Sequence, residues 1–237
     1  MKPVIALLQF ATILPLGKPV DFKNFARHSY LYPLAGYVIG GIAAVAVYRI
    51  TNPMIAAAVA VTLVLLISGC NHFDGLLDFG DGLMAHGDRK KRIQALTDRQ
   101  IGADGVALGI TVALILFAGL ASSAQAAAVI LAGEVCAKFS MAFLTTTGKP
   151  FSDGIHSYLH RFSRPYFPVL ALLLCLPLLF LPLSPLKLAG AAAAMIICPV
   201  ILLVLARKLF GGVNGDVVGA SNEITRAIVV LCIALLP

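Results

Sequence analysis

Apolar segments as long as a lipid bilayer is thick make up most of this chain, and they limit the folds that it can adopt. A transmembrane helix needs ~20 largely apolar residues, and within a bilayer only helices and closed barrels satisfy every backbone hydrogen bond. The chain is 59% hydrophobic and 12% charged, whereas a soluble domain is about 25% charged. Apolar length and turn signals predict spans at about 29–48, 54–72, 105–122, 125–147, 166–185, 188–206 and 217–236.

These spans predict an all-α fold, a polytopic integral membrane helix bundle with about seven transmembrane helices. No polar stretch is long enough for a separate soluble domain, so residues 1–237 are expected to form a single transmembrane domain. The shorter apolar run at 3–16 is expected to lie at the membrane interface or to re-enter the bilayer. Whether it spans stays open.

The basic residues between the predicted spans fall mainly on one side. One set of loops holds thirteen of them, and the other set holds two, Arg49 and Lys187. Cytoplasmic loops carry an excess of Lys and Arg, so we expect a multi-pass protein of the cell membrane whose basic loops face the cytoplasm. The net charge of +7 then mostly reflects topology, and no nucleic-acid partner is expected. The lipid bilayer is the expected surrounding, and a homo-oligomer stays open.

The acidic residues gather at the same side as the basic loops. Orientation in the membrane does not require this, because Asp and Glu contribute little to the positive-inside rule. A functional site at this side would explain it. The residues concerned are Asp74, Asp78, Asp81, Asp88, Asp98, Asp104, Asp153, Asp216 and Glu223.

The stretch NHFDGLLDFGDG (71–82) places three of these acids close together. On a helix, the spacing of Asp74, Asp78 and Asp81 keeps them within about 60° of one face. Like charges at this spacing repel, so the group needs basic partners or a bound cation. Magnesium prefers carboxylate oxygens and is often completed by substrate phosphates. The alternative is a helix end in water with solvated acids.

A basic stretch follows in HGDRKKRIQALTDRQIGADG (86–105). By itself, the run from Arg89 to Arg92 is explained by contact with lipid headgroups. Next to an acidic metal site it gains a second interpretation, because phosphoryl-transfer sites combine a metal with Arg or Lys around the phosphate.

Two further features are ambiguous. In FGGVNGDVVGASNE (210–223), Asp216 and Glu223 are seven residues apart and share a helical face. The simpler explanation is a glycine-rich loop with a helix cap. Glu134 and Lys138 are four apart inside an apolar span. An intramembrane ionisable pair indicates a functional site by default, and a structural ion pair is the alternative.

Four sequence motifs occur in order along the chain. Residues 72–82 match H-[LF]-D-G-L-x-D-x-x-D-G at every position, and residues 97–105, TDRQIGADG, are similar to K-D-S-R-I-G-x-x-G. Residues 211–223 fit G-G-x-T-G-D-x-x-G-A-x-x-E with Asn214 in place of Thr, and residues 32–40 fit Y-P-L-x-G-x-x-x-G. Together these motifs resemble the cobalamin synthase family, the adenosylcobinamide-GDP ribazoletransferases.

The chain departs from the family pattern at two basic positions. Gln100 stands where the family usually has Arg, and Lys138 where an Arg is common. Arg99 is the neighbour that would supply the missing charge. A shift of one residue turns a side chain ~100° around a helix, so the role of Arg99 is the weakest of those that the resemblance implies.

The resemblance implies an enzyme that joins adenosylcobinamide-GDP to α-ribazole or α-ribazole 5′-phosphate. The products would be adenosylcobalamin, or its 5′-phosphate, and GMP, by Mg²⁺-dependent phosphotransfer. It implies magnesium ligands at Asp74, Asp78 and Asp81, of which Asp81 is either a further ligand or the base that takes the hydroxyl proton. It adds Asp98 to the catalytic group. The implied substrate-binding residues are His72, Arg89, Arg92, Arg99, Asp216, Glu223 and Lys138.

Two other functions stay as alternatives. A phospholipid-type CDP-alcohol phosphotransferase would carry a longer motif, D-x-x-D-G-x-x-A-R followed by G-x-x-x-D-x-x-x-D, but residues 78–86 read DFGDGLMAH. A cation transporter would place acids near the middle of its spans and repeat a pair of broken helices, and the sequence has no such repeat. The choice between α-ribazole and its phosphate, the lower-ligand base and the number of metal ions stay open.

Overall fold

The computed structural model describes residues 1–237 and contains helices but no β-sheet. The elements are α1 (Lys2–Ala11), α2 (Lys23–Ala26), η1 (Ser29–Leu31), α3 (Tyr32–Val47), α4 (Pro53–Ile67), α5 (Asn71–Met84), α6 (Arg89–Leu96), α7 (Ala103–Ala121), α8 (Ala126–Thr147), α9 (Ile155–Phe162), α10 (Phe167–Cys175), η2 (Leu176–Phe180), α11 (Pro185–Leu209) and α12 (Gly215–Leu235). The predicted all-α fold is confirmed.

Five helical segments are long and apolar enough to cross a membrane. They are η1 with α3, α7, α8, α11 and α12. Two more segments pass the same test only as pairs, α4 with α5 and α9 with α10, and these pairs bend by 93° and 96°. If each bent pair is one span, the number of spans is seven. The structure therefore agrees with a polytopic helical membrane protein.

Two of the predicted spans are interrupted. The helix predicted at 54–72 ends at Ile67, because Gly69 and Cys70 take left-handed backbone angles, with φ of 65° and 58°, and turn the chain into α5. The helix predicted at 166–185 ends at Phe180, and its last turns are the 3₁₀ segment η2. Pro177 lies in that segment, and proline has no N–H for an α-helical hydrogen bond.

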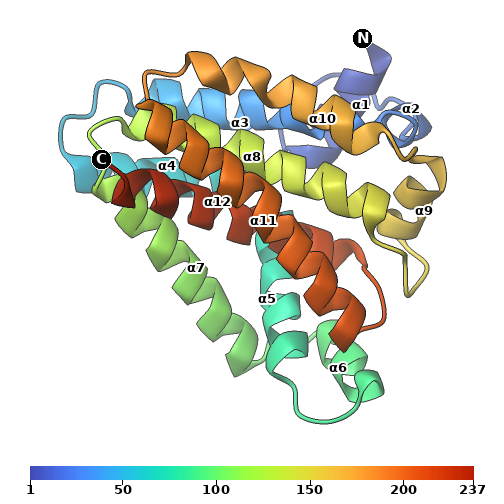
Figure 1. Cartoon of the computed structure of the whole chain (residues 1–237). Helices are drawn as coiled ribbons and strands as arrows, with labels where there is room; N and C mark the ends of the chain where they lie inside the picture. Colours follow the sequence, from blue (N-terminus) through green and yellow to red (C-terminus); the bar gives the residue numbers. More distant parts are fainter.

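Helix α8 lies in the middle of the bundle and packs against α3, α10, α11 and α12 (Figure 1). In its most apolar stretch 83% of the residues are buried, which is the highest share among the five long segments. The approach of α3 depends on Gly36, because a Cβ at this position would lie 2.7 Å from the Cα of Val135. Small residues at such contacts let membrane helices pack closely.

Helix α5 leaves the direction of α4 and descends toward α6, across the first turns of α7 and α12 (Figure 1). Two glycines permit these crossings. A Cβ at Gly80 would lie 2.8 Å from the Cα of Gly105, and a Cβ at Gly75 would lie 2.9 Å from the carbonyl oxygen of Asp216. Because α5 turns by 93° from α4 and its acidic face reaches the surface, α5 is taken as the part of this bent pair that lies outside the membrane.

Candidate active site

The acidic motif forms one helix, α5, as its spacing predicts. Asp74 is exposed, and Asp78 and Asp81 are half-buried on the same side. The other side of the helix, including Leu76 and Phe79, is buried. This amphipathic division holds three carboxylates at the surface, where α7 and α12 begin.

A fourth carboxylate, Asp216, comes from the first turn of α12. Its backbone lies against Gly75, between the positions of Asp74 and Asp78 on α5. Asn214 orients it: the Asn214 side-chain amide donates to Asp216 Oδ2 at 2.6 Å, and Asn214 Oδ1 accepts from Val217 N at 3.1 Å as the cap of α12. The structure thus brings together acids that are more than 130 residues apart.

The pKa of Asp78 reflects the negative charges of the acids around it. Burial, with the negative charges of Asp216, Asp74 and Asp81, raises the pKa of Asp78 to about 7. All ion pairs of the structure lie elsewhere, between buried residues of α8 and α12. No Lys or Arg therefore neutralises Asp74, Asp78 or Asp216, and the site has the unmatched negative charge that a cation would balance.

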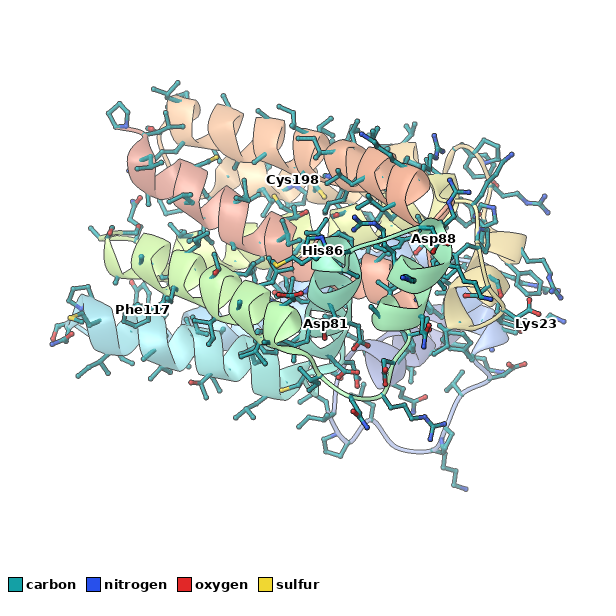
Figure 2. All side chains as sticks on the ribbon, turned by 90° about the horizontal axis from the view of Figure 1, so that it is seen from below. Lys23, Asp81, His86, Asp88, Phe117 and Cys198 are labelled. Carbon is teal, nitrogen blue, oxygen red and sulfur yellow. The ribbon has the colours of Figure 1, made fainter.

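Asp81 has a different environment from its two neighbours. Its Oδ2 accepts a hydrogen bond from Gly102 N at 2.7 Å, and its Oδ1 accepts one from Gly105 N at 2.8 Å. These are N–H groups at the start of α7, which have no partner within their own helix. Side chains on either glycine would collide with the carboxylate. Asp81 thus fixes the start of α7 to α5, and this explains the glycines of the I-G-A-D-G sequence. Asp81 is labelled in Figure 2, which views the molecule from below.

The basic residues of α6 lie beside the C-terminal end of α5. Arg92 Nη1 donates to the carbonyl oxygen of Leu83 at 2.7 Å and thereby caps α5. Arg89 is exposed and lies against Gly211, next to the loop that leads into α12. Asp98 and Arg99 are exposed in the loop between α6 and α7. Asp98 accepts from Gln100 N at 3.1 Å and is not among the acids that raise the pKa of Asp78.

A family model described as cobalamin-5-phosphate synthase matches residues 3–234. The chain belongs to this family. The motif resemblance found in the sequence is confirmed.

Proteins named adenosylcobinamide-GDP ribazoletransferase are similar to the chain over most of its length. One from Archaeoglobus fulgidus is 36% identical and covers 91% of this chain and 89% of its own. One from Methanococcoides burtonii is 32% identical, with 95% and 89% covered. One from Deinococcus radiodurans is 35% identical, with 92% and 80% covered. No solved structure matches the chain.

Two positions of the family's sequence pattern, Lys138 and Glu223, lie in a buried network. Lys138 Nζ is 2.8 Å from Glu134 Oε1 and donates to Asn222 Oδ1 at 2.8 Å. Arg226 pairs with Glu134 Oε2 at 2.8 Å and also with Glu223. These groups have at most 2% of their side chains exposed. The contacts are those of a structural network, and the predicted role of Lys138 and Glu223 in substrate binding stays a prediction.

Sequence reasoning missed two members of this network, Asn222 and the charged residue Arg226. Arg226 is the only basic residue within the last apolar span, and a lone cation there calls for a buried acid. His72, the first residue of the family's acidic signature, is also buried and lies along a cavity beside Asp216. Its role in substrate binding stays a prediction.

Proposed function

We propose that this chain joins adenosylcobinamide-GDP to α-ribazole, or to α-ribazole 5′-phosphate, and releases GMP. Membership of the cobalamin-5-phosphate synthase family supports this reaction, as do the relatives named adenosylcobinamide-GDP ribazoletransferase. The observation that carries the proposal is the group of carboxylates from α5 and α12 that no basic side chain neutralises.

The donor set of this group fits magnesium. Asp74, Asp78 and Asp216 offer carboxylate oxygens, the ligands that Mg²⁺ prefers, and Mg²⁺ usually keeps waters and binds substrate phosphates. No three acidic, histidine or cysteine side chains already converge on one point, so a phosphate-bearing substrate would have to supply part of the coordination. When bound there, the ion would neutralise charge on the transferring phosphate. Asp81, with both oxygens bonded to backbone N–H groups, is better suited to hold α7 than to take a proton.

In the proposed reaction, a ribose hydroxyl of the acceptor attacks the cobinamide-side phosphorus of the donor. A new P–O bond forms, the bond from this phosphorus to the bridging oxygen breaks, and GMP leaves with the bonding electron pair. The hydroxyl proton passes to a carboxylate of the site. We assign Arg89, exposed beside the loop into α12, to steady the diphosphate. We further propose that this end of the bundle faces the cytoplasm, because the basic loops lie there.

An assay of GMP release by the detergent-purified protein tests the proposal. We expect release from adenosylcobinamide-GDP that needs both α-ribazole and Mg²⁺ and stops in excess chelator. Release of CMP from CDP-alcohols, without GMP from adenosylcobinamide-GDP, would contradict the proposal and favour a lipid phosphotransferase. GMP release that continues undiminished in chelator would remove the metal from it.

A further inference from the structure

A cavity of 400 Å³ opens beside the acidic group, on the bundle side of Asp216. Its walls come from the ends of α1 and α8 and from the starts of α3, α5, α9 and α12. Its volume lies within the range of about 300–1,000 Å³ that is typical of ligand pockets. Asp216 belongs both to this cavity and to the acidic group. A molecule bound in the cavity therefore contacts one carboxylate of the acidic group directly.

Two buried histidines along the cavity lack hydrogen-bond partners at one ring nitrogen. His156 is 3% exposed and His72 is 6% exposed, and the Nδ1 atom of each is unpaired. His156 Nε2 lies 3.0 Å from the carbonyl oxygen of Gly148. A carbonyl only accepts, so Nε2 carries the proton, and Nδ1 of the neutral ring is an acceptor. Buried polar groups without partners are rare in folded proteins. His156 thus brings an unused hydrogen-bond acceptor, which is itself enclosed by protein, to the wall of the cavity.

The cavity wall indicates which substrate it would hold. It contains no Lys or Arg, and Asp216 is its only charged side chain. Apolar side chains, Phe10, Tyr32 and Leu159 among them, form part of the wall, and Gln9, Asn71 and Thr145 add uncharged polar groups. A diphosphate would find no positive charge there and would meet a carboxylate. A flat, uncharged heterocycle joined to a hydroxyl-bearing sugar fits the wall.

We propose that this cavity binds the nucleoside part of the acceptor, with the base of α-ribazole against the apolar wall and its ribose toward Asp216. The assignment rests on the proposed function. His156 Nδ1 accepts a hydrogen bond from a ribose hydroxyl. The attacking hydroxyl lies at the Asp216 side of the cavity, where the acidic group begins. The new P–O bond forms as GMP leaves with the electrons of the broken bond, and the hydroxyl proton passes to the carboxylates of the site. The donor binds outside the cavity, on the exposed acidic face of α5.

Gly215 provides a direct test. It lines the cavity, and a Cβ added to it meets no protein atom within 4 Å. We expect Gly215→Leu to fill the cavity and to raise the KM for α-ribazole at least ten-fold, while the KM for adenosylcobinamide-GDP stays within two-fold. Gly41→Leu on α3, where a Cβ likewise meets nothing within 4 Å, is the matched control and should keep both values.

Binding of α-ribazole to the purified protein without donor, measured by calorimetry, gives a readout that does not depend on turnover. We expect Gly215→Leu to lose this binding and Asp74→Ala to keep it. If Gly215→Leu kept the wild-type affinity for α-ribazole, or raised the KM of the donor instead, the assignment of the cavity would be wrong. GMP release by the wild type would still support the reaction in that case. No GMP release by the wild type would instead refute the proposed function. Should Gly215→Leu not fold, Gly215→Ala is expected to raise the acceptor KM about three-fold.

Discussion

At the scale of single residues, the three acids of α5 have the same chemistry but different surroundings. Asp74 is exposed and Asp78 is half-buried, and neither has an ion-pair partner, whereas Asp81 accepts two backbone hydrogen bonds. Sequence spacing treats them as one group, because all three share a helical face. Only the positions of Gly102 and Gly105 in space separate the acid that anchors α7 from the acids that are free to bind.

We expect this difference to appear in paired variants. Asp78→Asn should lower GMP release by roughly 100-fold or more, as loss of a group that supports a metal does, with little change in thermal stability. Asp81→Asn should also destabilise the protein, by ~1–3 kcal/mol, because an amide cannot accept both backbone N–H bonds as the carboxylate does. Thermal unfolding and GMP release, measured in the same detergent, check both. Equal stability of the two variants would refute the anchoring role of Asp81.

The raised pKa of Asp78 predicts how metal binding depends on pH. Metal ligands must be deprotonated, and the carboxyl group of Asp78 has a pKa of about 7 in the free protein. We therefore expect the apparent affinity for Mg²⁺ to be lower at pH 6 than at pH 8, by about ten-fold. Titration of the purified protein with Mg²⁺ at both pH values measures this. Asp78→Asn should lose most of the pH dependence, and an unchanged profile in this variant would assign the effect to another group.

At the scale of elements, the position of α5 depends on two glycines and on the turn at Gly69 and Cys70. The turn ends α4 and redirects the chain by 93°. Gly75 and Gly80 then bring the backbone of α5 against α12 and α7. Without this close crossing, Asp216 would not lie beside Asp74 and Asp78.

A methyl group at Gly75 should therefore separate α5 from α12. We expect Gly75→Ala to reduce GMP release and to destabilise the fold by ~1–3 kcal/mol, because an added Cβ would lie 2.9 Å from the backbone oxygen of Asp216. Gly41→Ala, with no atom near the added Cβ, is the control and should leave activity intact. Thermal unfolding curves and assays of the two variants make the comparison. Wild-type behaviour of Gly75→Ala would show that the helices can shift without cost.

At the scale of the whole molecule, four buried charges connect α8 with α12. Two of them are acids and two are bases, and at most 2% of each side chain is exposed: Glu134, Glu223, Lys138 and Arg226. Charges buried in this way stabilise a fold only as a complete set, because removal of one partner leaves an unbalanced charge in a low-dielectric interior.

Arg226→Met should accordingly destabilise the protein by ~3–5 kcal/mol, since Glu134 and Glu223 would lose their shared cation. We expect the double variant Arg226→Met, Glu223→Gln to recover part of this loss, because it removes the acid that is left without a salt-bridge partner, whereas Glu134 keeps Lys138. Thermal unfolding of the single and double variants forms the test. If Glu223→Gln alone raised a substrate KM without lowering stability, the substrate-binding role predicted from the sequence would be favoured instead.

The sequence by itself determined the helical membrane fold, the order of most spans and the face of α5 that carries the acids. These follow from local properties, namely apolar length and helical periodicity. Tertiary structure decided what depends on contacts between distant segments: the bend that interrupts the span predicted at 54–72, Asp216 beside Asp74 and Asp78, the hydrogen bonds of Asp81, and the pairing of Arg226. The physical reason is that a residue's chemistry depends on its neighbours in space, and periodicity along one helix carries no information about which other helix will pack there.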